Sequence, residues 1–505
     1  MEVVNLFELA EKKFYKMTDF LENKNSYDLQ LSELENYLKN DGSDLLRFLL
    51  IGHLNSRGVG DIGEFVIGID GHKRTHKRIR SRVIKTLFGK IKIPRVGYSQ
   101  RNISSLFPLD AMLNLPLSNI SYVLQKNLIL EVIKSSFVES VSSIERWTGV
   151  KITTKQAKKV IIEAAEDFDK FYEYKKDFEN KHANEHPLMI LTCDGKGIVM
   201  RYEDLREETQ KRAAKKMKQK FSNNTTGKRT DSKRMATVAS VYEIDRFIRK
   251  PDDIYSEFFK KSESKKNAKR PSPISKRVWA SIEKTSENTI RKMFEEALNR
   301  PNYERKEWVA VVDGDLNQIK MIKKYARKFD INIVIICDII HILEYLWKAG
   351  KALNEKKKVE QWVSEKFELV LEGKSSYVAS GMRRSATFRK LEKLAREPID
   401  TCARYLLNHS DYLRYDEYLK LGYPIATGVI EGACRHLVKD RMGITGARWG
   451  LKGAEALLKL RSLKISGDFN TYWKFYESNQ YNRNYSDLYK DPSILKVSSQ
   501  SQVSS

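Results

Sequence analysis

The spacing of apolar residues predicts helices at the start of the chain and short strands after them. Over residues 1–56 the apolar positions recur every three or four residues, which is the period of an amphipathic helix. Residues 57–100 lose this period. They contain short β-branched runs with turns at Gly71 and Gly89, which predicts a small β segment.

The helical period returns from about residue 116 to 180, within the predicted segment 101–185. One predicted helix ends at Gly149, and a second begins a few residues later. This order is typical of a helix-turn-helix, in which the second helix would bring Lys155, Lys158 and Lys159 to DNA. A plain helical hairpin has the same pattern, so both interpretations stay open.

A pattern rich in β-branched residues follows. The run 187–202 predicts an apolar strand, a sharp turn and a second strand, and 234–247 predicts a third. Two further apolar runs, 308–315 and 331–338, are separated by a helix long enough for a right-handed crossover. Three hairpin-connected strands followed by two parallel strands is the chain order of the ribonuclease-H-like fold. We therefore predict an α/β core of this fold with a mixed five-stranded sheet.

Two segments interrupt this core. Residues 203–233 are polar and basic, and residues 341–420 keep the helical period throughout, which predicts an all-helical insertion. The predicted organisation is a helical segment (1–56), a basic small β segment (57–100), a helical DNA-binding region (101–185), the first part of the core (186–340), the helical insertion (341–420), the last core helices (421–475) and a tail (476–505).

The chain is strongly basic, with 92 Lys and Arg against 66 Asp and Glu and a formal net charge of +26. Such an excess on a globular composition favours a polyanionic partner, and nucleic acid is the commonest. Between Lys73 and Arg95 there are ten Lys or Arg and no acid, so we expect phosphate binding there, with a solvated surface as the alternative. The residues predicted to contact DNA are Lys73, Arg74, Lys77 and Arg78 in this ribbon, and Lys211, Lys215, Lys228 and Arg229 in the basic insertion.

Membrane and export functions are not indicated. The first residues include early acids and no basic flank before an apolar run, unlike a signal peptide. The most apolar stretch, 331–340, is about half a bilayer span and contains Asp338. The four cysteines lie far apart and form no CxxC pair, which argues against a disulfide framework or a zinc ribbon. We therefore expect a cytoplasmic protein.

Three acids stand at equivalent places in the predicted core. Asp194 and Asp313 each follow an apolar run, at the carboxyl ends of strands that the predicted fold makes parallel neighbours. Glu431, one turn inside a later helix, is the third. Close carboxylates repel one another unless a cation lies between them. We therefore predict that Asp194, Asp313 and Glu431 are catalytic and hold Mg²⁺ or Mn²⁺, with two ions in the site.

Each acid also has a simpler structural explanation. Asp194 and Asp313 are both followed by glycine, and Asp-Gly pairs are ordinary turn formers after a strand. Glu431 and Arg435 are four residues apart on one helix, the spacing of a weak surface salt bridge. The coincidence of three such acids in a strongly basic chain favours the catalytic interpretation.

Four strings of the sequence carry a resemblance to a known family. They are LTCDGKGIVMR, VVDGDLNQI, CDIIHILEYLWKAG and YPIATGVIEGACRHLVKDRMGITGARWGLKGAEALLKLR. The chain resembles bacterial insertion-sequence transposases of the ISKra group, which are related to the Mutator-like superfamily of DDE transposases. The resemblance implies an enzyme that binds terminal inverted repeats. It also implies metal-dependent DNA strand cleavage and strand transfer through Asp194, Asp313 and Glu431.

The resemblance also implies an auxiliary motif shortly after the second acid. The relatives have Cys or Asp, two residues and then His, which corresponds here to Asp338 and His341. An all-helical insertion before the glutamate is likewise a family feature, and 341–420 fits it. Asp338 competes with Asp313 for the second catalytic position, and Asp313 is favoured because the fourth strand borders the first. Alternatively, Asp338 only caps a helix and His341 only packs.

The expected partners are double-stranded DNA, at the element's ends and at the target, and further copies of the chain on that DNA. The resemblance implies a bacterial protein that associates with the nucleoid when it binds DNA. Two other functions stay open. One is a catalytically inactive DNA-binding regulator derived from a transposase, and the other is a ribonuclease-H-like nuclease without strand transfer. The role of residues 1–56 stays open as well.

Overall fold

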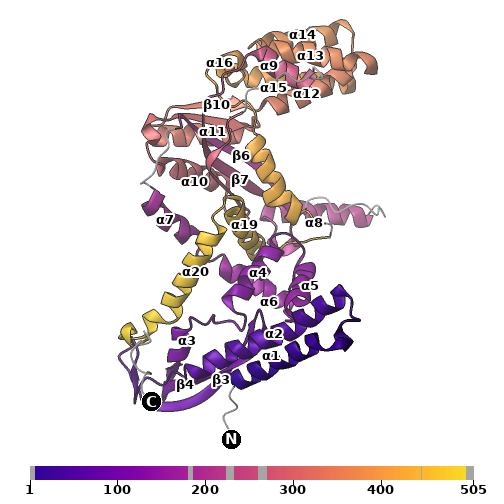
Figure 1. The fold of residues 1–505 in the computed structure, drawn as a ribbon. Helices are drawn as coiled ribbons and strands as arrows, with labels where there is room; N and C mark the ends of the chain where they lie inside the picture. The colour runs from indigo at the N-terminus through magenta and orange to yellow at the C-terminus, as the bar shows by residue number, and fades with distance from the viewer. Residues whose placement is uncertain (1–5, 180–185, 223–231, 260–269, 445, 496–505) are drawn as a thin grey trace. The chain divides into compact units, whose positions relative to one another are not determined.

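The computed structural model describes residues 6–179, 186–222, 232–259, 270–444 and 446–495 (Figure 1). The chain divides into two units. The first contains Met1–Phe168 and Phe469–Ser505, and the second contains Asp169–Asp468. Within the described ranges, no helix combines the length and the apolar character needed to cross a membrane.

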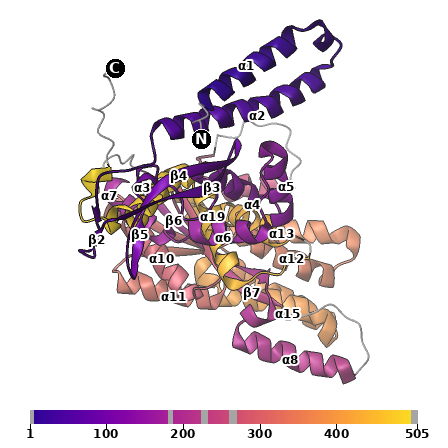
Figure 2. The same cartoon turned by 90° about the horizontal axis from the view of Figure 1, so that it is seen from below.

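The first unit begins with a helical hairpin. Helices α1 (Leu6–Glu22) and α2 (Leu31–Ser56) lie side by side, as Figure 2 shows, within the segment predicted to be helical. Phe20 on α1 stacks on Tyr37 on α2, with 4.2 Å between the ring centroids.

A small antiparallel sheet follows the hairpin. It contains β3 (His76–Thr86), β4 (Gly89–Gln100) and β5 (Ile103–Leu106), and a separate pair consists of β1 (Val66–Ile67) and β2 (Lys73–Arg74). Ile84, Ile91 and Ile93 form a buried cluster against which Leu50 and Leu54 of α2 pack. The basic ribbon is therefore a folded hairpin with an apolar side.

The remaining helices of the first unit are α3 (Pro108–Met112), α4 (Tyr122–Val132), α5 (Phe137–Thr148), α6 (Thr154–Ala164) and α20 (Phe469–Asn484), and α7 (Phe168–Glu179) begins at its boundary. Helix α5 ends at Gly149, which has a left-handed φ of 67°. Helix α6 begins with a capping box at Thr153. The predicted helix, turn and helix are present. Lys155, Lys158 and Lys159 are exposed on α6.

The second unit is built on a mixed five-stranded sheet, as predicted. Its strands are β6 (Leu188–Val199), β7 (Lys233–Ile244), β8 (Ile274–Ser281), β9 (Glu307–Val312) and β10 (Ile333–Cys337). Their order across the sheet is β10-β9-β6-β7-β8. Strands β6, β7 and β8 are antiparallel neighbours, whereas β9 is parallel to both β6 and β10.

Two of the strand predictions are wrong. Residues 187–202 do not form two strands with a sharp turn, because β6 continues through them and pairs along its whole length with β7. Gly195 lies opposite Thr237 in this ladder and lacks the positive φ that many turns after a strand require. The sequence pattern also misses β8. This strand begins with an exposed Ile274 and three polar residues and is buried only from Val278 onward.

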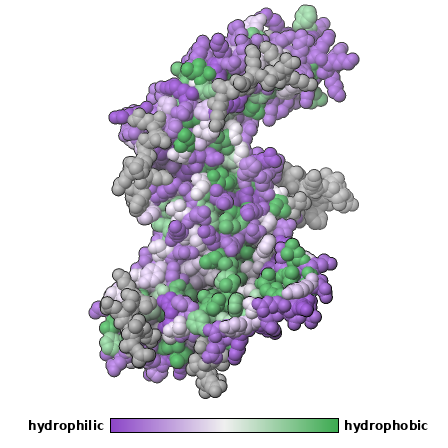
Figure 3. All heavy atoms as spheres, viewed as in Figure 1, coloured by the Kyte–Doolittle hydropathy of each residue, from purple (hydrophilic) through white to green (hydrophobic). Residues whose placement is uncertain are grey.

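Helices surround this sheet and form the segment between β10 and α17. They are α8 (Glu207–Ser222), α9 (Pro251–Phe259), α10 (Ser286–Leu298), α11 (Leu316–Lys328), α12 (Ile339–Leu353), α13 (Val359–Leu371), α14 (Ser375–Phe388), α15 (Lys393–Asn408), α16 (Tyr415–Lys420), α17 (Gly428–Ala433), the π-helix η6 (Cys434–Lys439), α18 (Asp440–Met442) and α19 (Leu451–Ile465). Residues 341–420 contain helices and turns but no strand, as predicted. Their visible surface is mostly hydrophilic in Figure 3, and inside it Phe367 and Leu406 join the core that contains Val309 and Ile336.

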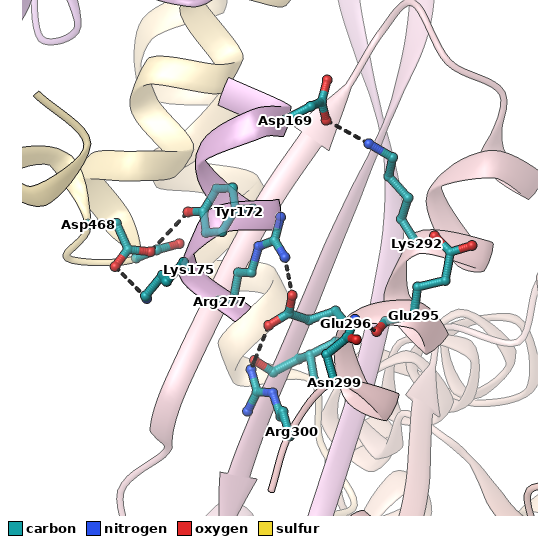
Figure 4. A network of polar contacts seen from close by, with 12 residues as sticks. Asp169, Tyr172, Lys175, Arg277, Lys292, Glu295, Glu296, Asn299, Arg300 and Asp468 are labelled. Atoms are coloured by element: carbon teal, nitrogen blue, oxygen red, sulfur yellow. Dashed lines mark hydrogen bonds and ion pairs between the residues drawn. The ribbon is translucent and has the colours of Figure 1, made fainter. Parts of the chain in front are cut away.

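A chain of half-buried ion pairs joins β8 to α10 within this unit (Figure 4). Glu296 pairs with Arg277 and, at 3.5 Å, with Arg300. Arg277 also lies over the ring of Tyr172 on α7, 3.5 Å from its centroid. Burial raises the pKa of Glu296, but the charges of Arg277 and Arg300 outweigh it and bring the pKa below its usual value. The carboxylate therefore stays ionised and ties the helix to the strand.

Candidate active site

Three aspartates directly follow the last paired residues of three neighbouring parallel strands. The pairing of β6 with β9 ends at Cys193 and Val312, and the pairing of β9 with β10 ends at Val312 and Cys337. The next residues are Asp194, Asp313 and Asp338. Because neighbouring strands lie about 4.8 Å apart, these residues form a row at one edge, with Asp313 in the middle. The prediction that the strand of Asp313 borders the strand of Asp194 is confirmed.

Asp194 is half-buried and lies inside a strand. The antiparallel pairing of β6 with β7 continues past Asp194 to Val199, whereas the parallel pairing of β6 with β9 ends at Cys193. The thiol of Cys434 donates a hydrogen bond to Oδ2 of Asp194 at 3.1 Å. Its other oxygen, Oδ1, accepts from the backbone N–H of Gly195 at 2.6 Å. The side chain is therefore held from two directions.

Asp313 occupies the turn between β9 and α11. Its Oδ1 accepts the backbone N–H of Asp315 at 3.0 Å, and Gly314 between them has a φ of 90°. Asp315 in turn caps α11 by accepting the N–H groups of Asn317 and Gln318. The turn predicted from the Asp-Gly pair is present, and it leaves the half-buried Asp313 beside the strand of Asp194.

Asp338 is fully buried and caps α12. Its Oδ1 accepts the backbone N–H of Ile340 at 2.7 Å, as the capping alternative requires. Its Oδ2 accepts the backbone N–H of Thr427 at 3.1 Å and also the Thr427 hydroxyl. Thr427 is the residue from which α17 starts. Asp338 therefore connects the end of β10 to the helix that contains Glu431.

Glu431 lies in the first turn of α17, as predicted, and is exposed. Two contacts hold its helix at the strand ends: Thr427 binds Asp338 at one end, and Cys434, the first residue of the π-helix η6, binds Asp194 at the other. π-helical turns inside α-helices are frequent at functional sites. Glu431 is thus carried by a segment hydrogen-bonded to both outer acids of the row.

Burial and mutual repulsion raise the pKa of two of these acids. For Asp313, burial is the largest cause and the charge of Asp194 adds to it, whereas the N–H of Asp315 and the charge of His341 oppose it. For Glu431, burial is again the largest cause, followed by the charge of Asp338, with His341 opposing. An added cation would relieve this repulsion.

One group of three side chains lies close enough together to share a metal ion. Within the described residues, a ligand atom of Asp338, of His341 and of Glu431 lies within 4.8 Å of the others. Asp194, Asp313 and Glu431 are not gathered this closely. The carboxylates suit Mg²⁺ or Mn²⁺, and a histidine nitrogen favours Mn²⁺ over Mg²⁺. The predicted auxiliary pair therefore lies with Glu431, next to the two remaining acids.

The predicted DNA contacts in the ribbon differ in their exposure. Lys73, Lys77 and Arg78 are exposed, but Arg74 is only 2% exposed and is unsuited to bind DNA. It donates to both oxygens of Asp70 and, through Nε, to the carbonyl of Ser104 at 2.8 Å. The prediction for Arg74 is therefore wrong: an acid just outside the ribbon neutralises it.

Acids outside the ribbon partly neutralise its other cations too. Lys77 pairs with Asp61 at 2.9 Å, and Asp110 pairs with both Arg82 and Arg95. In the basic insertion, Lys211 and Lys215 are exposed on α8. Lys228 and Arg229 lie outside the described residues.

Sequence reasoning missed several residues that contact the acids. Cys434 follows Glu431 by three residues, so helical spacing could have placed both on one face. Thr427 precedes α17 and could have been recognised as a helix start, but not as a partner of Asp338. Tyr405 and His409, which contact the backbone at Asp313 and Gly314, carry no local signal of their role.

Comparison with known proteins adds no identification. A scan against models of protein families and a search of curated proteins find no match for this chain.

Proposed function

We propose that the protein is a DNA transposase of the insertion-sequence group that it resembles. The observation that carries the proposal is the row of acids at one sheet edge. Asp194 and Asp313 follow the last pair of two adjacent parallel strands, and Glu431 lies on a helix hydrogen-bonded to the same edge. Acids brought together in this way from distant parts of the chain are typical of metal-dependent phosphoryl transfer.

The topology of the sheet supports the same proposal. Numbered from β6, the strand order is 3-2-1-4-5, with the first three strands antiparallel and the last two parallel. This agrees with the ribonuclease-H-like chain order expected from the sequence. The all-helical segment between β10 and α17 corresponds to the insertion that the resembled family has before its glutamate.

The donor groups fit a divalent cation. Asp194, Asp313 and Glu431, with Asp338 and His341 beside them, would hold Mg²⁺ or Mn²⁺, and two ions are expected. Such ions lower the pKa of an attacking water or 3′-hydroxyl and stabilise the charge that develops at phosphorus. The raised pKa values of Asp313 and Glu431 fit a site that needs added positive charge.

The residues of the chain itself would hold the acids and the DNA. Cys434 and Thr427 orient the carboxylates of Asp194 and Asp338. The exposed cations of β3 and of α8 would bind DNA phosphates at the element's ends and at the target, and further copies of the chain are expected on that DNA. The net charge of +26 supports a double-stranded DNA partner.

A cleavage and joining assay tests this function. The substrate is an end-labelled duplex from the DNA that flanks the coding region, including any inverted repeats, with a plasmid as target. Cleavage followed by joining is the expected result. Cleavage without joining would indicate a nuclease, and binding without cleavage would indicate a regulator.

Two matched variants assign the reaction to the acids. Asp194→Asn keeps the size of the side chain but removes a charged ligand, so cleavage should fall by orders of magnitude while DNA binding persists. Asp252→Asn changes an exposed aspartate in the first turn of α9 and should leave both intact. Full cleavage by Asp194→Asn would remove Asp194 from the site.

A further inference from the structure

The turn that carries Asp313 is contacted by the helical insertion. Helix α15 ends at Asn408, and its Tyr405 donates a hydrogen bond from Oη to the carbonyl oxygen of Asp313 at 2.7 Å. His409, which follows the helix, has its Nε2 2.8 Å from the carbonyl oxygen of Gly314. Two successive carbonyls of the turn are therefore bound by two side chains of one helix end.

The contact leaves no room for a side chain at Gly314. The residue has a φ of 90°, which favours glycine, and a Cβ atom built on it would overlap the hydroxyl group of Tyr405. The shape of the turn and the position of Tyr405 thus depend on one another.

Stacking fixes the two contacting side chains. The ring of Tyr405 stacks on Tyr345 of α12 at 4.4 Å and on His409 at 4.2 Å, with interplanar angles of 28° and 25°. His409 is only 4% exposed, and its Nδ1 lies 2.8 Å from the carbonyl oxygen of Tyr405. A neutral ring donates to one of its two carbonyl neighbours, and the doubly protonated ring donates to both. With a proton on Nε2, either in that neutral tautomer or in the doubly protonated ring, His409 donates to the carbonyl oxygen of Gly314 in the turn.

The insertion contacts the next strand end in a similar way. Tyr415 of α16 is fully buried and donates from Oη to the carbonyl oxygen of Cys337 at 2.7 Å. Cys337 is the last residue of β10 and precedes Asp338. The insertion therefore holds the backbone beside two of the three aspartates in the row.

We propose that Tyr405 and His409 are positioning residues, through which the helical insertion fixes the direction of the Asp313 carboxylate. The inference rests on the proposed function, because it gives Asp313 a role in holding a cation. The hydrogen bonds from these two side chains go to backbone atoms of the turn and not to the carboxylate of Asp313. They hold the carbonyls of residues 313 and 314, and the carboxylate follows the backbone. Groups that orient a metal ligand commonly change affinity or activity by about 10–100-fold when removed.

The test compares side-chain substitutions in the full chain. Tyr405→Phe removes only the hydroxyl group, and Tyr418→Phe is its matched control, because Tyr418 donates to Asp411 within the insertion. His409→Ala removes the second contact, and His409→Gln returns an N–H donor near Nε2. Each variant is measured for melting temperature, DNA binding, Mn²⁺ affinity by electron paramagnetic resonance, and single-turnover cleavage.

The positioning role predicts a specific combination of results. Tyr405→Phe should keep its melting temperature and DNA binding but lose about tenfold or more in Mn²⁺ affinity and in cleavage. His409→Ala should behave similarly, His409→Gln should recover much of the loss, and Tyr418→Phe should match the wild type. Unchanged Mn²⁺ affinity and cleavage in a folded Tyr405→Phe protein would overturn the inference. If Tyr405→Phe does not fold, the comparison of His409→Ala with His409→Gln tests the inference: unchanged Mn²⁺ affinity and cleavage in a folded His409→Ala protein would overturn it.

The outcome is separable from that of the proposed function. If the wild type cleaves and Asp313→Asn does not, the function stands, and an active Tyr405→Phe refutes only the positioning role. If the wild type neither binds Mn²⁺ nor cleaves DNA, the proposed function itself fails.

Discussion

The thiol of Cys434 lies 3.1 Å from Oδ2 of Asp194, so the segment that contains Glu431 is hydrogen-bonded directly to the strand that contains the first acid. Burial and the charge of Asp194 raise the pKa of Cys434, which keeps the thiol protonated at neutral pH. A protonated thiol can donate, and a thiolate cannot. Burial and the nearby carboxylate therefore keep Cys434 in the protonated form that can donate to Asp194.

This contact predicts different effects for two substitutions. Cys434→Ala removes the donor and should reduce single-turnover cleavage about tenfold, because Asp194 loses a group that orients it. Cys434→Ser keeps a donor at the same place and should retain most of the activity. Equal activity of Cys434→Ala and wild type would show that the thiol only fills space.

His341 is predicted to act in the site rather than in the fold. His341→Ala should change the free energy of unfolding by less than about 1 kcal/mol, because the side chain is only half-buried. Cleavage should fall at least tenfold, a loss of about 1.4 kcal/mol in transition-state stabilisation. The matched control is His436→Ala, an exposed histidine of the π-helix that pairs with Asp440. Normal cleavage at normal stability would remove His341 from the site.

The basic ribbon should contain two kinds of cation. Replacing exposed Lys73 and Arg78 by Gln should weaken binding to all DNA sequences and lower the slope of log affinity against log salt by about 0.9 for each lost phosphate contact. Arg74→Gln should instead lower the melting temperature without changing that slope, since Arg74 is buried on Asp70. Filter-binding titrations at several salt concentrations, beside thermal melts, distinguish the two outcomes. A slope change in folded Arg74→Gln would contradict the structure.

Metal should stabilise the protein in a pH-dependent way. The pKa values of Asp313 and Glu431 are raised in the folded state, so their ionised forms reduce stability at neutral pH, and this penalty disappears as pH falls through those pKa values. Mn²⁺ should therefore raise the melting temperature at about pH 7 and have little effect at about pH 4, where protons compete for the ligands.

Asp313→Asn provides the control for this metal effect. The neutral side chain removes the repulsion with Asp194, so this variant should melt higher than wild type without metal and lose the Mn²⁺ shift. A Mn²⁺ shift of the same size in the variant would place the metal elsewhere.

The sequence predicted the acids better than it predicted the strands around them. Asp194, Asp313 and Glu431 could be placed because apolar runs and a helical period end or begin at them. The hairpin expected after Asp194 was wrong because Gly195 tolerates an extended backbone as readily as a turn. Its ladder partner, β7, lies beyond the basic insertion, so no local pattern could decide between the two conformations.

Contacts between distant residues set the rest of the site. Asp70 is only four residues from Arg74, but the Ser104 carbonyl that accepts from its Nε is 30 residues away, and only the fold brings it to the buried guanidinium. Tyr405 and His409 are four residues apart at the end of an ordinary amphipathic helix. That they meet the turn at Asp313 depends on the packing of the whole insertion.

The helical insertion leaves and rejoins the sheet at one point. The N–H of Ile339 donates to the carbonyl of Ile425 at 3.0 Å, next to the bond between Asp338 and Thr427. When the two ends of a segment are held together, each doubling of its length raises the free-energy cost of closing the loop by only about 0.6 kcal/mol. Extra residues in the turns between α13, α14 and α15 should therefore lower the free energy of unfolding only slightly. The insertion can lengthen or shorten at those turns while the four acids keep their places.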